Sequence, residues 1–428
     1  MGKKKEISKN AEKRHEKEEL AKRVSRELFS KFYVQQYGLA RWESLLFALT
    51  KPVRYCALMM RWTDAGFAHS LLGVGVGSYP LIPEVFPNVF VKLISTDIIP
   101  SSAGGEDFGE VDVLKHEHDC EILGSSDTAS KESSSVSTSV DMWPHPGAPS
   151  SLDSNGLCCY YPLDAASLFP VKILSVQLND RVFDICAAPG GKSLAILQYL
   201  FGGLGSLVCG DISTDRRMRL RNVMKRYVPA SLLSRVSIVA GDGATSQFID
   251  EFGERSFDKI LVDAPCSSER HVLHSEEELM KWAPGRTKAN AERQMSLLLT
   301  ALRLCRAGGR VVYSTCSLSN VENDAVVLKA IRRANKYDRA KRTDDVGFIS
   351  AVRPVEIGEV PFGEKTECGW AFLPDVSDGW GPIYMSVIDV RSEITATNDD
   401  RVLTVAIGGK ECLDDANEDR EYIVADEN

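Results

Sequence analysis

Two cysteines stand directly after apolar, strand-like runs of the sequence. Cys316 follows VVYST in the stretch VVYSTCSLSNVEND, and Cys266 follows ILVDAP in the stretch ILVDAPCSSERH. A strand-terminal cysteine is most often a small buried apolar residue, and we expect that role for Cys186, Cys209 and Cys305. A thiolate is also a strong nucleophile that splits one difficult reaction into two easier covalent steps. The two motif contexts make Cys266 and Cys316 the candidates for such chemistry.

Three aspartates end successive strand-like segments. Asp211 closes the second segment, Asp242 the third and Asp263 the fourth. In open α/β sheets, an acid at the end of the second strand holds ribose hydroxyls, and an acid after the third can accept a hydrogen bond from an exocyclic amine. A single aspartate at a strand end is most often a cap. Three of them beyond one sheet edge indicate a ligand site.

The first strand-like segment runs into a glycine-containing turn, DICAAPGGKS at residues 184–193. Gly190 and Gly191 would let the backbone approach a ligand closely, and the helix expected after them offers free N–H groups. The turn is neither a phosphate-binding GxxxxGK[ST] loop nor a dinucleotide-binding GxGxxG loop. A nucleotide-like ligand and a simple tight connection both remain open on this stretch alone.

Strands and helices alternate from residue 156 onward. Short apolar runs separated by helices predict a parallel sheet that is covered on both faces. Such sheets bind ligands beyond the carboxyl ends of their strands, where the cysteines and aspartates lie. The expected strands are 181–187, 206–211, 235–242, 259–265 and 310–315. The expected helices include GGKSLAILQYL, DRRMRLRNVMKRY, 287–306 and 320–335.

The bulk composition suits a globular protein. The chain has 428 residues, 43% of them hydrophobic and 26% charged, and no apolar run approaches the ~18 residues of a membrane-spanning helix. Eleven irregularly spaced cysteines predict a reducing compartment. The net charge of −9 is uneven, because residues 97–155 carry −10 and residues 393–428 carry −8. The remainder is therefore basic, with a balance of +9, and a nucleic-acid-binding face is compatible with it.

We expect four regions along the chain. Residues 1–96 would form a basic arm and a helical N-terminal layer, with helical spacings over 29–72. The first 26 residues are interpreted as a solvated helical arm; a nucleic-acid arm and a transit peptide are the alternatives, although their glutamates count against the latter. The other regions are an acidic, serine-rich disordered insert (97–155), the α/β domain (156–392) and an acidic disordered tail (393–428).

Several motifs resemble those of the NSUN (Nol/Nop/Sun) family of RNA cytosine-C5 methyltransferases, which use S-adenosylmethionine. The resemblance covers about residues 156–392. The motifs that carry it are CAAPGGK (186–192), DAPCS (263–267) and STCS (314–317). The features closer to the mitochondrial ribosomal-RNA branch, the fourth NSUN paralogue, are YYPLDAASLFPV (160–171), the RH at 270–271 and GWGPIY (379–384).

The resemblance implies an α/β fold, a Rossmann-like class I methyltransferase with a mostly parallel seven-stranded sheet and helices on both faces. It implies methylation of RNA, most of all mitochondrial ribosomal RNA, in the mitochondrial matrix. It also implies a helical-repeat partner that resembles mitochondrial transcription terminators. The residues implied to contact S-adenosylmethionine are Cys186, Ala187, Ala188, Pro189, Gly190, Gly191, Lys192, Asp211, Arg216, Asp242, Gly243 and Asp263.

The resemblance further implies that Cys316 is the nucleophile. Its attack on C6 of cytosine would make C5 electron-rich enough to take a methyl group. Asp263 could hold a proton for N3 of the base, since burial raises a carboxyl pKa. Lys192 would orient Asp263 or the base, or else cap a loop. Cys266 would assist proton loss from C5 and release of Cys316.

The segment after Cys316 also contains a helix-start signal. Ser319 and Glu322 form the S-x-x-E pattern of a capping box. A helix beginning there would place its positive end near the nucleophile and favour the thiolate.

Two alternatives remain at this point. The same chemistry could act on transfer RNA, or the chain could be a ribosome-assembly scaffold that has kept the fold without catalysis. The intact pair of cysteines argues against the scaffold. His271 and His274 form an HxxH pattern, but no third ligand accompanies them, so we expect no metal.

Overall fold

The computed structural model describes most of the α/β region and parts of the N-terminal region. The described residues are 2–72, 78–80, 88–92, 146–340, 348–352, 363–377 and 379–392. The acidic tail and residues 97–145 of the expected insert lie outside them. Within the described ranges, no helix is both long enough and apolar enough to span a bilayer.

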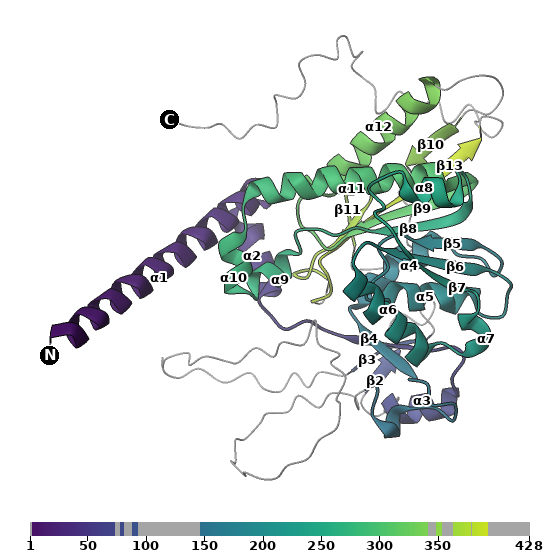
Figure 1. The fold of residues 1–428 in the computed structure, drawn as a ribbon, viewed down its shortest axis with the longest axis horizontal. Coiled ribbons are helices and arrows are strands. Elements are labelled where there is room, and N and C mark those ends of the chain that lie inside the picture. The colour runs from purple at the N-terminus through teal and green to yellow at the C-terminus, as the bar shows by residue number, and fades with distance from the viewer. Residues whose placement is uncertain are drawn as a thin grey trace.

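A single nine-stranded sheet forms the centre of the α/β region (Figure 1). Its order is β11-β12-β13-β9-β8-β5-β6-β7, with β10 beside β13. The expected parallel core is confirmed for five strands: β5 (Arg181–Asp184), β6 (Ser206–Asp211), β7 (Val236–Ala240), β8 (Phe257–Asp263) and β9 (Cys305–Thr315). The other four are antiparallel: β10 (Phe348–Val352), β11 (Glu364–Lys365), β12 (Trp370–Phe372) and β13 (Ile383–Ser392).

The sheet has nine strands rather than the expected seven. The difference lies at one edge, where β11 and β12 extend the sheet as a short antiparallel hairpin. These strands are two and three residues long, which is too short for a period-two pattern to be recognised in the sequence.

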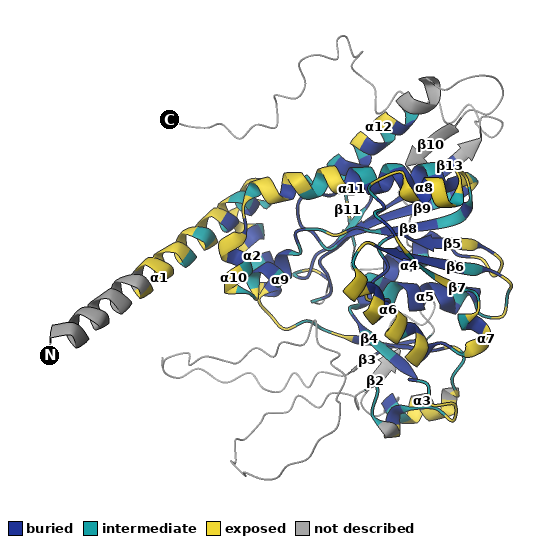
Figure 2. Cartoon of the chain, viewed as in Figure 1, coloured by how far each residue is buried: buried dark blue, intermediate teal, exposed yellow. Residues whose placement is uncertain are grey.

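Helices cover both faces of the sheet, as expected. Neighbouring strand residues point to opposite faces, so Val182 packs in one apolar cluster and Phe183 in the other. The first cluster includes residues of α4, α5 and α6, and the second residues of α8, α11 and α12. Figure 2 shows the strands buried between these layers. The helices are α4 (Phe169–Leu174), α5 (Gly191–Leu200), α6 (Thr214–Tyr227), α7 (Ala230–Leu233), α8 (Gln247–Phe252), α9 (Glu269–Leu273), α10 (Glu276–Lys281), α11 (Pro284–Leu304) and α12 (Asp324–Ala340).

The N-terminal region contains strands as well as helices, so the expected helical layer over 29–72 is wrong in part. A small antiparallel sheet has the order β2-β3-β1-β4. Its strands are β1 (Cys56–Met59), β2 (Ser78–Pro80), β3 (Val89–Lys92) and β4 (Tyr160–Leu163), and α3 (Ala65–Leu72) follows the first of them. All four residues of β1 are buried. An apolar run of this length is compatible with a buried helix turn and with a buried strand. It forms a strand here because its backbone pairs with β3 and β4.

The expected insert is folded at its C-terminal end. Residues 149–151 form a short 3₁₀ helix, and Ser151 is fully buried. The Asp153 carboxylate accepts hydrogen bonds from the backbone N–H groups of Asn155 and Leu157. This side-chain turn satisfies backbone groups in a stretch whose serine and proline content had indicated disorder.

Two N-terminal helices reach across to the α/β region. These are α1 (Gly2–Tyr37) and α2 (Leu39–Leu49), and the N-terminal part of α1 extends beyond the rest of the described fold (Figure 1). Their anchor is an aromatic cluster in which Phe29 meets Trp282 edge-on at 4.9 Å and Tyr33 stacks on Trp42 at 5.1 Å. Leu318, two residues after Cys316, is buried in the same cluster.

Candidate active site

The carboxyl ends of β8 and β9 bring the two cysteines into contact. Asp263 pairs with Ser314 in the parallel register, so the loops that follow leave the sheet side by side. The Cys266 and Cys316 sulfurs are 2.9 Å apart, and the backbone N–H of Cys316 donates to the Cys266 sulfur at 3.3 Å. Both side chains are half-buried. The structure therefore places two thiols where one reacting atom could reach both.

The two thiols are not equivalent. Hydrogen bonding to Cys316, followed by burial, raises the pKa of Cys266 well above its ordinary value. Cys266 is thus a neutral thiol at physiological pH and can donate its proton to the sulfur of Cys316. Ser268 Oγ lies 3.5 Å from the same sulfur. The Cys316 sulfur is therefore in contact with both the Cys266 sulfur and the Ser268 hydroxyl oxygen.

Lys192 and Asp263 form an ion pair beside the cysteines, with Lys192 Nζ 2.9 Å from Asp263 Oδ2. Burial lowers the pKa of Lys192, but Asp263 and the Cys316 sulfur outweigh it and raise this pKa overall. The deep burial that we expected for Asp263 is not found, because 29% of its side chain is exposed. The raised pKa keeps Lys192 an ammonium, and Asp263 holds it in place.

The loop at residues 186–192 needs both of its glycines. Gly190 has φ +122°, and a Cβ atom there would stand 2.9 Å from Leu220 of α6. A Cβ atom on Gly191 would stand 2.8 Å from the Tyr161 ring of β4. The loop thus packs directly on α6 and β4, and α5 begins at Gly191 with its first N–H groups at the carboxyl edge of the sheet.

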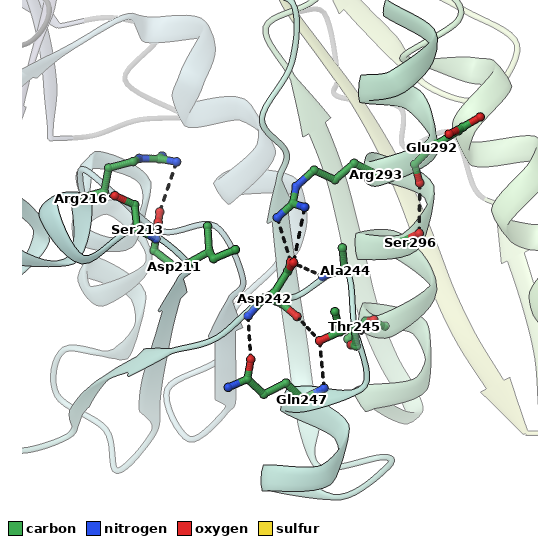
Figure 3. A network of polar contacts seen from close by, with 12 residues as sticks. Asp211, Ser213, Arg216, Asp242, Ala244, Thr245, Gln247, Glu292, Arg293 and Ser296 are labelled. Carbon is green, nitrogen blue, oxygen red and sulfur yellow. Dashed lines mark hydrogen bonds and ion pairs between the residues drawn. The ribbon is translucent and has the colours of Figure 1, made fainter. Parts of the chain in front are cut away.

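Arg216 connects Asp211 to this loop. The Asp211 Oδ1 atom accepts from the Ser213 backbone N–H at 2.9 Å, and its Oδ2 atom lies 3.4 Å from the Arg216 guanidinium (Figure 3). Arg216 also donates to the carbonyl oxygen of Ala188. Oδ2 itself is buried and makes no hydrogen bond to any described residue. A buried acceptor of this kind is suited to a ligand hydroxyl.

Asp242 has a partner that the sequence did not reveal. Arg293 of α11 donates to its Oδ1 atom at 2.8 Å, and the Ala244 backbone N–H donates to the same atom at 3.0 Å (Figure 3). A lone arginine on a helix 51 residues away in sequence carries no local signal of this pairing. The neighbouring Gly243 is enclosed, since a Cβ atom there would stand 2.9 Å from Leu297.

The expected capping box after Cys316 is wrong. Ser319 Oγ accepts from the Val321 N–H, and α12 begins only at Asp324. The Glu322 carboxylate instead accepts from the Ser267 backbone N–H at 3.0 Å and from Gln294 Nε2 at 2.7 Å. The S-x-x-E pattern had assigned the Glu322 carboxylate to a helix start. The carboxylate instead binds Ser267, in the loop after β8, and Gln294 of α11.

The HxxH histidines lie near α2. His274 Nε2 is 2.9 Å from the carbonyl oxygen of Leu49. No group of three or more metal-ligating side chains occurs among the residues that the structure describes.

Comparisons with known proteins agree with this geometry. The family model of the 16S rRNA methyltransferases RsmB/F matches residues 171–352. The chain is 39% identical over 248 residues to "5-cytosine rRNA methyltransferase NSUN4" of Mus musculus, covering 55% of this chain and 61% of that protein. It is 44% identical over 230 residues to "tRNA (cytosine(34)-C(5))-methyltransferase, mitochondrial" of Danio rerio, covering 53% and 59%. The chain spans less than two thirds of the length of these curated relatives.

Solved structures show the same fold. The crystal structure of NSun6 from Pyrococcus horikoshii with SFG superposes with a TM-score of 0.57 at 16% identity, covering 85% of this chain and 97% of that chain. The crystal structure of PH0851 gives a TM-score of 0.55 at 18% identity, covering 83% and 64%. The fold is therefore that of the methyltransferases, and the resemblance indicated by the motifs is confirmed. Residues 171–352 match the model of the RsmB/F methyltransferases, and the chain is similar in sequence to NSUN4.

Proposed function

We propose that this protein transfers a methyl group from S-adenosylmethionine to C5 of cytosine in RNA through a covalent bond between Cys316 and C6. The observation that carries the proposal is the 2.9 Å contact between the Cys266 and Cys316 sulfurs beside the Lys192–Asp263 ion pair. The printed names of the relatives, which are 5-cytosine rRNA and tRNA (cytosine-C5) methyltransferases, support the same reaction.

The side chains at the carboxyl edge of the sheet suit S-adenosylmethionine. The buried Asp211 Oδ2 atom, which makes no hydrogen bond to a described residue, suits a ribose hydroxyl, and the first N–H groups of α5 follow the 186–192 loop at the same edge of the sheet. Asp242 is the acceptor assigned to the adenine amine. The NSun6 structure that shares the fold was solved with SFG, an analogue of S-adenosylmethionine. When bound, S-adenosylmethionine supplies an activated methyl group on a sulfonium.

We assign each step of the reaction to particular residues of this chain. The Cys316 thiolate adds to C6, which breaks the aromaticity of the ring and makes C5 nucleophilic. Lys192, held by Asp263, supplies a proton for the charge that develops on the base. After transfer, the C5 proton is lost to water, the electrons of the C5–H bond re-form the C5–C6 double bond, the Cys316 sulfur leaves C6 as a thiolate, and the proton on the base returns to Lys192. Cys266 assists this elimination, because it is the second sulfur in contact with the first.

The proposed substrate is mitochondrial ribosomal RNA, with the matrix as compartment and a helical-repeat protein resembling transcription terminators as partner. The ribosomal branch rests on the NSUN4 relatives, and transfer RNA is the alternative that the mitochondrial transfer-RNA relative supports. A target base within a duplex must be flipped out of the stack, so unpaired loops are the expected sites.

Substrate choice is tested with radiolabelled methyl groups. We expect the full chain, with tritiated S-adenosylmethionine, to label mitochondrial small-subunit ribosomal RNA, and bisulfite sequencing to place the product at one or a few cytosines. Label on transfer RNA alone would replace the ribosomal assignment with the alternative. Label on neither RNA, or on an atom other than C5, would overturn the proposed activity.

Asp211→Asn is expected to weaken binding of S-adenosylmethionine by roughly 10- to 100-fold, because a hydrogen bond to a charged acceptor contributes about 1.5–3 kcal/mol. Isothermal titration calorimetry of the RNA-free protein measures the change. Asp215→Asn, an exposed aspartate in the first turn of α6, is the matched control and should bind like the unaltered chain. Equal affinity in both variants would remove Asp211 from the cofactor site.

A further inference from the structure

Two carboxylates are buried together beneath the cysteine loops. Glu269 begins α9, three residues after Cys266, and Glu322 lies in the turn after Cys316; neither side chain is exposed. One hydroxyl joins them. Ser317 Oγ is 2.9 Å from Glu269 Oε1 and 3.2 Å from Glu322 Oε1. The bridge therefore connects the two loops that carry the candidate thiols.

The hydrogens at this bridge can be counted. Ser317 has a single hydroxyl hydrogen, so it donates to only one of the two carboxylates. Its oxygen already accepts from the Ser319 backbone N–H at 3.1 Å and has one lone pair left. The contact with the second carboxylate is a hydrogen bond only if that carboxyl carries a proton. Both contacts of Ser317 are hydrogen bonds when one of the two carboxyls carries a proton, in addition to the hydrogen that the Ser267 hydroxyl donates to Glu322 Oε1.

The electrostatics of the cluster agree with this count. Burial, reinforced by the charge of Glu322, raises the pKa of Glu269 to about 7, and burial also raises the pKa of Glu322. Four described titratable groups that interact with the pair are neutral at pH 7, because the pKa of each is itself raised. They are Tyr33 and Tyr37 of α1, Tyr313 of β9, and Cys266.

The C-terminal end of α1 is fastened to the same cluster. Tyr33 donates to Glu269 Oε1 at 2.5 Å. Gln36 Nε2 and the Tyr37 hydroxyl each donate to the carbonyl oxygen of Leu318 at 2.7 Å, while the Leu318 backbone N–H donates to Glu269 Oε2 at 2.9 Å. The turn that follows Cys316 is therefore held from two sides, by α1 and by Glu269.

We propose that Glu269 is a positioning residue, which shares one proton with Glu322 across Ser317 and thereby holds the Cys266 and Cys316 loops in register with each other and with α1. The consequence for catalysis rests on the proposed function. The shared proton belongs to the folded chain and is independent of any RNA or S-adenosylmethionine.

The first test is the pH dependence of thermal unfolding. Because the pKa of Glu269 is raised in the fold, its contribution to stability is complete below its ordinary pKa of 4.5 and is lost as the pH rises through about 7. Between pH 6 and 8.5 the melting temperature of the unaltered chain is expected to fall by a few degrees. Glu269→Gln keeps a permanent donor and should flatten this fall, whereas Glu277→Gln, at an exposed position of α10, should not.

An equally steep fall in Glu269→Gln and in the unaltered chain would overturn the shared proton. Should Glu269→Gln fail to fold, Glu322→Gln removes the other half of the pair and is expected to flatten the same fall; a steep fall there overturns the proposal instead. Neither measurement uses RNA or S-adenosylmethionine, so neither depends on whether the chain methylates cytosine.

The second test is the pH profile of methyl transfer. We expect kcat of the unaltered chain to decrease above about pH 7.5 as the shared proton leaves, with little change in KM for RNA. In Glu269→Gln this alkaline decrease should disappear. If unfolding behaves as expected but the two kcat profiles coincide, Glu269 has a structural role only, and the positioning role is overturned.

Discussion

Cys316→Ala is expected to abolish methyl transfer while leaving the affinity for S-adenosylmethionine unchanged. Without the sulfur no covalent bond to C6 forms, and C5 of an intact aromatic cytosine is too poor a nucleophile to take the methyl group. We expect the rate to fall by roughly 10⁴-fold or more, the scale on which removal of an essential nucleophile acts. A filter assay with tritiated S-adenosylmethionine measures transfer, and calorimetry measures binding of the donor.

The matched control is Cys305→Ala. Cys305 is fully buried at the opposite end of β9 and takes no part in the site, so this variant should still methylate RNA. Residual transfer by Cys316→Ala within tenfold of the unaltered rate would assign the attack to another group, Cys266 being the nearest.

Cys266→Ala is expected to convert the enzyme into a trap for its own RNA. Attack and methyl transfer need only Cys316, but we assign assistance of the subsequent elimination to Cys266, whose neutral thiol can donate a hydrogen bond to the departing Cys316 sulfur. The covalent intermediate should therefore persist. On a denaturing gel, most of the RNA-bound Cys266→Ala protein should migrate as a slower band, and the unaltered protein should show almost none.

Two further results on the same gel test whether the slow band is a covalent adduct through Cys316 that Cys266 normally resolves. The double variant with both cysteines changed to alanine should give no slow band, because the bond to RNA is formed by Cys316. A Cys266→Ala lane without adduct, but with normal turnover, would show that another group completes the reaction and would remove Cys266 from the release step.

The parallel part of the fold followed from local sequence because each strand carries its own signal. The SLVCGD segment was expected as a strand at 206–211, and β6 has those bounds. Strands β5 and β8 are also short apolar runs that end in an aspartate, so the carboxyl edge and the residues gathered there could be predicted as well. Strands without such a signal were missed: β1 lies in a region whose helical spacing misled.

The parts of the site that were missed depend on pairs far apart in sequence. Tyr33 and Glu269 are separated by 236 residues, and Arg293 and Asp242 by 51. The S-x-x-E pattern after Cys316 is a valid helix-start signal by itself. It failed because tertiary partners on α11 and on the Cys266 loop bind the Glu322 carboxylate in the buried interior. A pattern of neighbouring residues cannot reveal these tertiary hydrogen bonds, which compete with the capping box for the Glu322 carboxylate.

The most direct test of the covalent account is to locate the bond to RNA in the Cys266→Ala adduct. Trypsin separates the two candidate sites, since residues 260–270 and 311–329 lie on different peptides. After nuclease digestion, mass spectrometry should find a methylated cytidine nucleotide on peptide 311–329, at Cys316. A nucleotide attached elsewhere in the chain, or an unmodified Cys316 in the protein of the slow-migrating band, would contradict the account.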